Sequence, residues 1–185
     1  MAPRHKQGGN LNQVRIIGGD KRRQLIRFPD SLALRPTPDR VRETLFNWLG
    51  QTLDGLVCLD LFAGSGVLGF EAASRGAARV MLVEKQPAVL ASLHQNLEKL
   101  AFADTVEIRR ADALEFAATT TECFDLVFLD PPYRQGWPEK LEAVLPRCLN
   151  AGARIYLETE YPLATFAGRD CLRQGKAGQV YHHLF

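Results

Sequence analysis

The sequence predicts an α/β fold in which a mostly parallel sheet carries helices on both faces. From Leu56 onward, short apolar runs alternate with segments of helical periodicity, which is typical of parallel strands joined by helices. A glycine-rich turn follows the first of these runs, as in folds that bind nucleotides. The length of 185 residues suits one such domain with a small extension.

The N-terminal part predicts a hairpin behind a polar, disordered tail. Two β-like runs, 14–17 and 24–28, are joined through Gly18, Gly19 and Asp20, and several basic residues follow this turn. We therefore expect a hairpin whose connection carries positive charge.

A helix is predicted after the hairpin. Thr37 is expected to cap it, Pro38 suits the first helical position, and Gly50 is expected to end it. The predicted division is then a basic N-terminal extension over residues 1–50 and a main domain over residues 51–185.

The main domain reads as alternating strands and helices. Strands are expected at 56–62, 79–84, 106–110, 124–130, 153–160 and 179–185. Helices are expected at 65–76, 87–100 and 138–149, the last kinked or ended by Pro146. The final strand, after the segment 171–178, is expected to run antiparallel to its neighbour.

Charge is unevenly distributed along the chain. Residues 1–50 hold ten lysines and arginines against four acidic residues, whereas the remainder holds thirteen against seventeen. A basic arm on a mildly acidic body suits either a solvated tail or a surface that contacts phosphates. No apolar run reaches the ~20 residues that a membrane-spanning helix needs. The four cysteines have no zinc-site spacing, so no metal is expected.

A glycine-rich turn and an acidic residue predict a nucleoside-type cofactor. Gly64, Gly66 and Gly69 have the GxGxxG spacing between a strand and a helix, and Glu84 ends the next strand. In this arrangement glycines let a cofactor approach the backbone, and the carboxylate holds ribose hydroxyls.

Asp60, four residues before Gly64, favours S-adenosylmethionine over a dinucleotide. A carboxylate there would repel a pyrophosphate, whereas it attracts a sulfonium or an ammonium group. Asp112, after the third strand, is expected to accept a hydrogen bond from an adenine amine, with the Ala113 amide close to the ring. The alternative role for Asp112 is that of a helix cap.

The motif Asp130-Pro131-Pro132-Tyr133 predicts the chemistry. Neither proline has an N–H, so the turn offers the Asp130 carboxylate and backbone carbonyls as acceptors. Two acceptors that hold the hydrogens of a nucleobase amine can direct its lone pair at a sulfonium methyl group. Tyr133 is expected to stack on a base flipped out of its helix.

These motifs together resemble the RsmD family, whose members methylate the exocyclic N2 amine of one guanine in 16S ribosomal RNA. The matching segments are RIIGG, LRPTPDRVRETLFNWL, LDLFAGSGVLGFEAASRGA, VE and FLDPPY, and they span residues 14–135. Ala33 stands where the family pattern has glycine. The resemblance implies a Rossmann-like, class I S-adenosylmethionine-dependent methyltransferase fold with seven strands in the order 3-2-1-4-5-7-6. One strand is therefore missing from our assignment, and we place it near 171–173.

The resemblance also implies the residues of the site. Catalytic residues are expected to be Asp130, Pro131, Pro132 and Tyr133. Cofactor contacts are expected from Asp60, Phe62, Ala63, Gly64, Gly66, Glu84, Lys85, Asp112 and Ala113. Contacts to RNA are expected from Lys21, Arg22, Arg23, Arg27, Arg35, Arg40 and Arg134, with Arg42 as a further candidate. Arg35 and Thr37 can alternatively line the active site.

The expected partner is 16S ribosomal RNA in an assembled or partly assembled small ribosomal subunit, since the chain has no evident base-reading module. We expect a cytoplasmic monomer. Two alternatives keep the methyl transfer but change the acceptor to a DNA adenine or a protein glutamine. A third, of another class, is an NAD-dependent oxidoreductase, which would leave the Asp-Pro-Pro-Tyr motif without a role.

Overall fold

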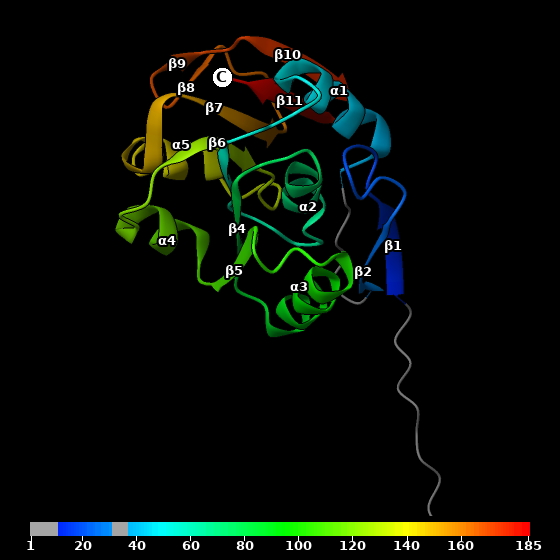
Figure 1. Cartoon of the computed structure of the whole chain (residues 1–185). Helices are drawn as coiled ribbons and strands as arrows, with labels where there is room; N and C mark the ends of the chain where they lie inside the picture. Colours follow the sequence, from blue (N-terminus) through cyan, green and yellow to red (C-terminus); the bar gives the residue numbers. More distant parts are fainter. Residues whose placement is uncertain (1–10, 31–36) are drawn as a thin grey trace, which may run out of the picture.

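A computed structural model gives the fold of residues 11–30 and 37–185 (Figure 1). Its centre is a seven-stranded sheet in the order β10-β11-β7-β6-β3-β4-β5. The strands are β3 (Val57–Asp60), β4 (Arg79–Glu84), β5 (Val106–Arg110), β6 (Phe124–Leu129), β7 (Leu149–Thr159), β10 (Arg173–Ala177) and β11 (Val180–Leu184). β3 to β7 are parallel, while β11 is antiparallel to both β7 and β10. The predicted fold class and strand order are confirmed.

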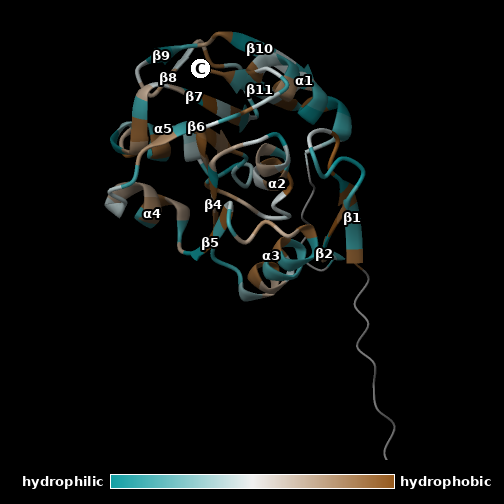
Figure 2. Ribbon diagram, in the orientation of Figure 1, coloured by the Kyte–Doolittle hydropathy of each residue, from teal (hydrophilic) through white to brown (hydrophobic). Residues whose placement is uncertain are grey.

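Helices cover both faces of this sheet, because successive residues of each buried strand point to opposite sides. One face packs against α1 (Asp39–Leu49), α2 (Val67–Ser74) and α3 (Pro87–Leu100). The other face packs against α4 (Ala113–Thr119), α5 (Trp137–Glu142) and the 3-10 helix Leu145–Cys148. Apolar residues are concentrated on the strands between these two layers (Figure 2).

The N-terminal hairpin consists of β1 (Leu11–Arg15) and β2 (Leu25–Pro29), paired antiparallel. It is not a detached arm: its buried side chains lie in the same apolar cluster as strand and helix residues of the main domain. These side chains are Val14, Ile16, Ile26 and Phe28. The division of the chain at residue 50 stays a prediction.

The hairpin connection lies on the C-terminal end of α2. Gly19 has φ +70°, and a Cβ atom at this position would lie 1.7 Å from the carbonyl oxygen of Ser74. The Ser74 hydroxyl donates to the Gly18 carbonyl and accepts from the Lys21 amide. Gly19 is therefore required by close backbone contact with α2, whereas a Cβ atom at Gly18 would lie 2.1 Å from the guanidinium of Arg75.

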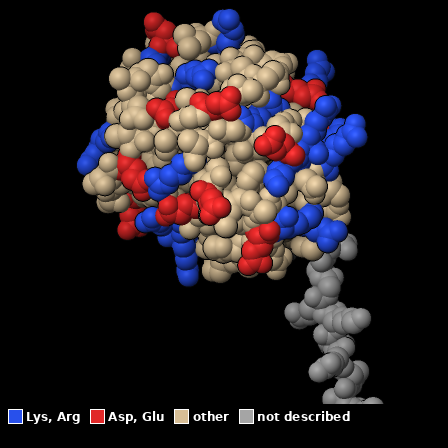
Figure 3. Space-filling view, viewed as in Figure 1, with Lys and Arg blue, Asp and Glu red and all other residues tan. Residues whose placement is uncertain are grey.

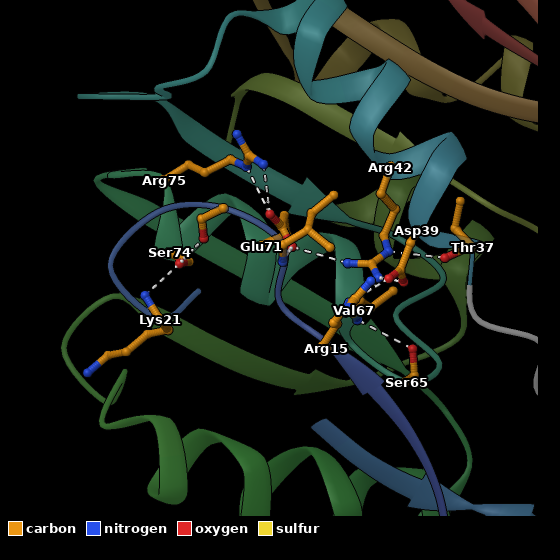
Figure 4. Close-up of polar contacts among 12 residues, drawn as sticks. Arg15, Lys21, Thr37, Asp39, Arg42, Ser65, Val67, Glu71, Ser74 and Arg75 are labelled. Carbon is orange, nitrogen blue, oxygen red and sulfur yellow. Dashed lines mark hydrogen bonds and ion pairs between the residues drawn. The ribbon is translucent and has the colours of Figure 1, made fainter. Parts of the chain in front are cut away.

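A buried ion-pair network joins the hairpin, α1 and α2 (Figure 4). Glu71 on α2 is fully buried and accepts from Arg42 of α1 (3.2 Å), from Arg75 (2.9 Å) and from the amide of Ile17 (2.9 Å). Arg42 is fully buried as well, so its candidacy for an RNA contact was wrong.

Several local expectations differ from the structure. Pro38, not Thr37, is the N-cap of α1, and Thr37 directs its hydroxyl at other side chains. The strand missing from our assignment is β10, which carries no alternating apolar residues because it is an edge strand that is largely exposed. A two-stranded ribbon, β8 (Thr165–Phe166) with β9 (Arg169–Asp170), was also not predicted. No described helix has the length and apolarity to cross a membrane.

Candidate active site

A cavity of about 720 Å³ lies at the carboxyl ends of the parallel strands. It borders the ends of β3, β4 and β6, and the turn after β5. This is the edge at which open α/β sheets bind ligands, and the volume suits a nucleoside-sized molecule. Of the predicted cofactor residues, Asp60, Phe62, Ala63, Gly64, Glu84, Lys85, Asp112 and Ala113 line it. All four residues of the Asp-Pro-Pro-Tyr motif line it too.

The glycine turn is held by Glu84. Its carboxylate accepts from the amide of Gly64 (3.1 Å) and from the amides of Lys85 and Gln86 (both 2.8 Å). Gly66 differs from the prediction, because it is not among the cavity-lining residues. It has φ +77° at the N-cap of α2, and a Cβ there would lie 2.6 Å from Leu93. Gly66 therefore serves the tight turn and the packing of the helix.

Asp60 is a buried carboxylic acid at the end of β3, with 2% of its surface exposed. One oxygen accepts from the Gly69 amide at 3.1 Å. Burial raises the pKa of Asp60 to about 7, and the charge of Glu84 acts in the same direction. None of the described lysines or arginines forms an ion pair with it.

Asp112 caps α4 and also lines the cavity, while its contact with an adenine amine stays a prediction. It lines the cavity, and its carboxylate also accepts from the Leu114 amide at 3.0 Å as the N-cap of α4. Lys85 lies 3.3 Å from the same side chain. The capping contact and the cavity position are compatible, because the carboxylate has a second oxygen.

Asp130 follows β6 and keeps some exposure toward the cavity. Burial raises the pKa of Asp130 well above its usual range, and the nearby carboxylates of Glu158 and Asp60 raise it further. The Tyr133 ring is 44% exposed, which leaves a flat aromatic surface at the cavity. The motif therefore presents an acidic acceptor and a ring together, as its composition predicted.

Glu158 on β7 is a site residue that the sequence interpretation missed. It is 5% exposed and accepts from Tyr156 (2.8 Å), Thr37 (3.3 Å) and Tyr133 (3.5 Å). The Thr37 hydroxyl also lies 3.4 Å from Asp130. Burial raises the pKa of Glu158 above its usual value. An acidic residue directly after the buried run Ile155–Leu157 was the available signal.

Trp137 was also missed. It lines the cavity and contacts Phe62 edge-on, with ring centroids 4.9 Å apart. Its indole N–H is buried, with no partner among the described residues. The tryptophan therefore gives the cavity an apolar wall beside Phe62, and an unused donor.

The predicted RNA contacts are mostly exposed and do not line the cavity. Arg22, Arg23, Arg27, Arg40 and Arg134 are exposed, and Lys21 is half-buried with its ammonium 5.7 Å from the centre of the Phe102 ring. Arg35 lies outside the described residues. Basic side chains gather on the side formed by α1 and the hairpin (Figure 3). Arg134 instead follows Tyr133, and its amide donates to Glu160.

The sheet order and the strand-end cavity define a Rossmann-like methyltransferase fold. The fold is shared with an RNA methyltransferase from Salinibacter ruber in complex with S-adenosyl-L-homocysteine, at 23% identity and a TM-score of 0.62, over 82% of this chain and 92% of that one.

The chain belongs to the family described as Conserved hypothetical protein 95, whose model matches residues 14–185, and this is the RsmD family that the motifs indicated. The Escherichia coli K12 relative named Ribosomal RNA small subunit methyltransferase D is 43% identical over 99% of this chain and 93% of its own. A solved Escherichia coli chain covers 94% of this one, with 97% of its own length, at 41% identity and a TM-score of 0.84.

Proposed function

We propose that this protein transfers a methyl group from S-adenosylmethionine to the N2 amine of a guanine in 16S ribosomal RNA. The observation that carries the proposal is one cavity that holds both the glycine turn with Glu84 and the Asp-Pro-Pro-Tyr motif. The name of the 43% identical relative supports an acceptor in the RNA of the small ribosomal subunit. Such an enzyme works in the cytoplasm, where ribosomal subunits are assembled.

The cofactor assignment rests on the charge of the cavity. Asp60 and Asp130 are carboxylates that lack an ion-pair partner among the described residues, so the cavity favours a ligand with positive charge. S-adenosylmethionine carries a sulfonium and an ammonium group. Glu84 is proposed to hold ribose hydroxyls, and Asp112, Phe62 and Trp137, which line the same cavity, are proposed to surround the adenine. No pyrophosphate would be accommodated beside Asp60.

The transfer itself needs positioning more than covalent catalysis. Asp130 and the carbonyls of the proline turn hold the two hydrogens of the guanine amine, and Tyr133 supports the base. The nitrogen lone pair forms the new N–C bond as the C–S bond breaks, and the sulfonium becomes a neutral thioether. The amine then loses one proton.

The exposed basic residues of the hairpin and α1 are proposed to contact RNA phosphates. Phosphate contacts give affinity and salt dependence rather than a choice of base. The RNA is therefore proposed to be presented within an assembled or partly assembled small subunit, whose surface supplies the specificity. The protein is proposed to act as a monomer.

The test is a labelling experiment on small ribosomal subunits from cells that lack the enzyme. The protein, or the Asp130→Ala variant, is incubated with these subunits and radiolabelled S-adenosylmethionine, and the RNA nucleosides are identified by mass. Label in N2-methylguanosine that is absent with Asp130→Ala supports the proposal. Cofactor binding without label in RNA contradicts the substrate and directs the search to DNA adenine and protein glutamine. Thermal protection by NAD instead of S-adenosylmethionine contradicts the cofactor.

The same assay separates two forms of the substrate. Equal rates and equal site choice on protein-free ribosomal RNA would contradict the requirement for a ribonucleoprotein particle. Slow or unselective labelling of free RNA, beside fast labelling of subunits, is the expected result.

A further inference from the structure

We propose that Thr37 links Asp130 to Glu158 as a one-proton relay, so that the two carboxylates together accept the proton that the substrate amine loses. This inference rests on the function proposed above and assigns roles to two residues outside the Asp-Pro-Pro-Tyr motif. Asp130 is the catalytic member, because it faces the substrate. Thr37 and Glu158 are positioning residues that act through it.

The geometry that carries the proposal is the position of one hydroxyl between two acids. Thr37 Oγ1 lies 3.4 Å from Asp130 Oδ2 and 3.3 Å from Glu158 Oε1. A threonine hydroxyl has a single proton, so it can donate to only one of these carboxylates at a time. It can accept from the other one when that group is protonated. The three groups therefore form a chain in which a proton that enters at one acid can leave at the other.

The remaining contacts of Glu158 are consistent with a proton-sharing acid. Tyr156 on the same strand donates to Oε1 at 2.8 Å, and Tyr133 from the catalytic loop lies 3.5 Å from Oε2. These hydroxyls stabilise the ionised form of Glu158 without neutralising it. No lysine or arginine of residues 11–30 and 37–185 pairs with Glu158 or Asp130, in contrast to Glu71.

The other titratable groups around the pair are acids, phenols and one imidazole. The imidazole belongs to His182 on β11, the register partner of Glu158, and burial lowers its pKa. Asp60 acts on Asp130 from the end of β3, while Tyr156 and Tyr133 act on Glu158. Burial keeps the pKa of Asp130 and Glu158 raised, and the negative charge of Glu158 adds to the rise at Asp130. The two neighbouring acids titrate as a pair, and the single proton that they share is held more tightly than a proton on an isolated acid.

The proposed step moves one methyl group to the amine and one proton from it. The guanine N2 lone pair forms the bond to the methyl carbon, and the pair of the C–S bond remains on sulfur. The nitrogen, now bearing a positive charge, gives one proton to Asp130. Asp130 passes a proton to Thr37 Oγ1, and the original Thr37 proton passes to Glu158. Glu158 also borders a small second hollow together with Glu160, through which the proton can reach solvent.

The backbone of Thr37 is fixed by the buried ion-pair network of α1 and α2. The Arg42 Nε–H donates to the Thr37 carbonyl at 3.1 Å, while the same guanidinium contacts Glu71 and Asp39 (Figure 4). Thr37 is 3% exposed, so its hydroxyl has little freedom to turn away. The relay is therefore fixed by the same segment that docks the N-terminal extension.

The test compares Glu158→Gln and Thr37→Val with wild type in single-turnover methyl transfer across pH. The methyl-transfer rate of each variant is expected to be roughly tenfold or more below that of wild type. This loss is smaller than the whole contribution of a general base, because Asp130 is still present. Thr37→Ser, which restores the hydroxyl, is expected to recover most of the loss. The double variant is expected to be no slower than either single one, because the residues act as a unit. Cofactor affinity and the RNA concentration for half-saturation are expected to stay unchanged.

The pH profile of the rate distinguishes the relay from a packing role, because a packing defect alone would not shift this profile along the pH axis. Loss of the Glu158 charge lowers the pKa of Asp130, so the acidic limb of the rate profile moves to lower pH in Glu158→Gln. Glu142→Gln, which removes an exposed carboxylate on α5, is the matched control and is expected to leave the limb in place. Thermal unfolding of each variant verifies that it is folded.

The outcomes separate the relay from the function on which it rests. A wild-type protein that binds cofactor but labels no guanine overturns the proposed function, and the relay with it. An active wild type whose rate and pH limb are unchanged in Glu158→Gln and Thr37→Val overturns the relay alone. A rate loss in Thr37→Val that Thr37→Ser does not recover also overturns it, because the threonine would then act through packing.

Discussion

Two groups of buried carboxylates in this protein have opposite surroundings. Glu71, between α1 and α2, is matched by Arg42, Arg75 and a backbone amide. The carboxylates at the strand ends, Asp60, Asp130 and Glu158, receive hydrogen bonds only from hydroxyls and amides among the described residues.

The difference separates a charge that stabilises the fold from charges that are available to a ligand. A buried ion that is fully paired holds elements together, and removing one partner is costly. A buried acid without a cation has a raised pKa and gains when positive charge arrives. The N-terminal extension and the cavity therefore use the same residue type for different purposes, and Thr37 lies between them.

The largest effect is expected at Asp130. Asp130→Ala removes the proposed acceptor for the hydrogens and the proton of the amine, so methyl transfer is expected to fall roughly 100-fold to 10,000-fold. Binding of S-adenosylmethionine, measured by calorimetry, is expected to weaken far less than the rate, because Asp60 still lines the cavity as a second unpaired carboxylate. A variant that retains more than a tenth of the wild-type single-turnover rate would contradict the role of this carboxylate.

The next largest effect is expected at Glu71, the buried carboxylate that is paired with two arginines. Glu71→Gln leaves Arg42 and Arg75 buried beside a neutral side chain, so the free energy of unfolding is expected to fall by about 3–5 kcal/mol. Urea unfolding measures it. Glu98→Gln, an exposed carboxylate on α3, is the control and is expected to change it by less than about 0.5 kcal/mol. Equal losses in the two variants would remove the distinction between the two regions.

At Asp60 a neutral substitution is expected to raise the free energy of unfolding, whereas at Glu71 it lowers it. Its pKa rises from 3.8 in the unfolded chain to about 7 in the folded one, so the folded state binds a proton that the unfolded state has lost. Stability from this group is therefore present below pH 3.8 and is lost as the pH rises through about 7.

Asp60→Asn keeps an acceptor for the Gly69 amide and removes that dependence. At pH 8 the free energy of unfolding of the ligand-free protein is expected to rise by about 2 kcal/mol, and at pH 4 to change little. Affinity for S-adenosylmethionine is expected to fall in the same variant. Thermal melts at both pH values, with and without cofactor, measure the two effects. A variant less stable than wild type at pH 8 would show that Asp60 is stabilised as an anion.

The smallest effect is expected on the basic surface. Arg22→Gln and Arg27→Gln each remove one proposed phosphate contact, so RNA affinity is expected to fall a few-fold. The slope of log affinity against log salt concentration is expected to become shallower by about one. Arg147→Gln, on the helical layer of the other sheet face, is the control. Filter binding at several salt concentrations measures the slopes. An equal slope change in the control would mean that the RNA surface lies elsewhere.

The sequence predicted most of the fold, because strand periodicity and turn residues are local signals. The bounds of β4, α3 and β5 agree with the predicted ranges 79–84, 87–100 and 106–110. β10 was misplaced because its residues, RQGKA, carry no apolar alternation on an exposed edge. Thr37 looked like a helix cap because its spacing to α1 fits that role, and only tertiary structure shows that Asp130 and Glu158 attract its hydroxyl.

The cavity was predictable where motifs mark strand ends. Asp60, Glu84, Asp112 and Asp130 each follow or end a strand, and parallel strands end at one edge. Glu158 was not predictable in this way, since it belongs to no recognised motif and reaches the site through the pairing of β7 with β6. Gly66 and Arg42 show the converse, because both belong to distinctive motifs but neither lines the cavity. Gly66 serves a tight turn and helix packing, and Arg42 forms a buried ion pair with Glu71.

We propose above that the cavity carboxylates Asp60 and Asp130 gain a positively charged partner only when the cofactor binds. Calorimetry of S-adenosylmethionine binding near pH 7, in two buffers of different ionisation enthalpy, measures the protons released. Proton release is expected, because the arriving positive charge lowers the pKa of Asp60 and Asp130. Less release is expected for S-adenosylhomocysteine, which lacks the sulfonium charge. Asp60→Asn is expected to reduce the release. Tight binding with no proton release, or equal release for both ligands, would contradict the claim.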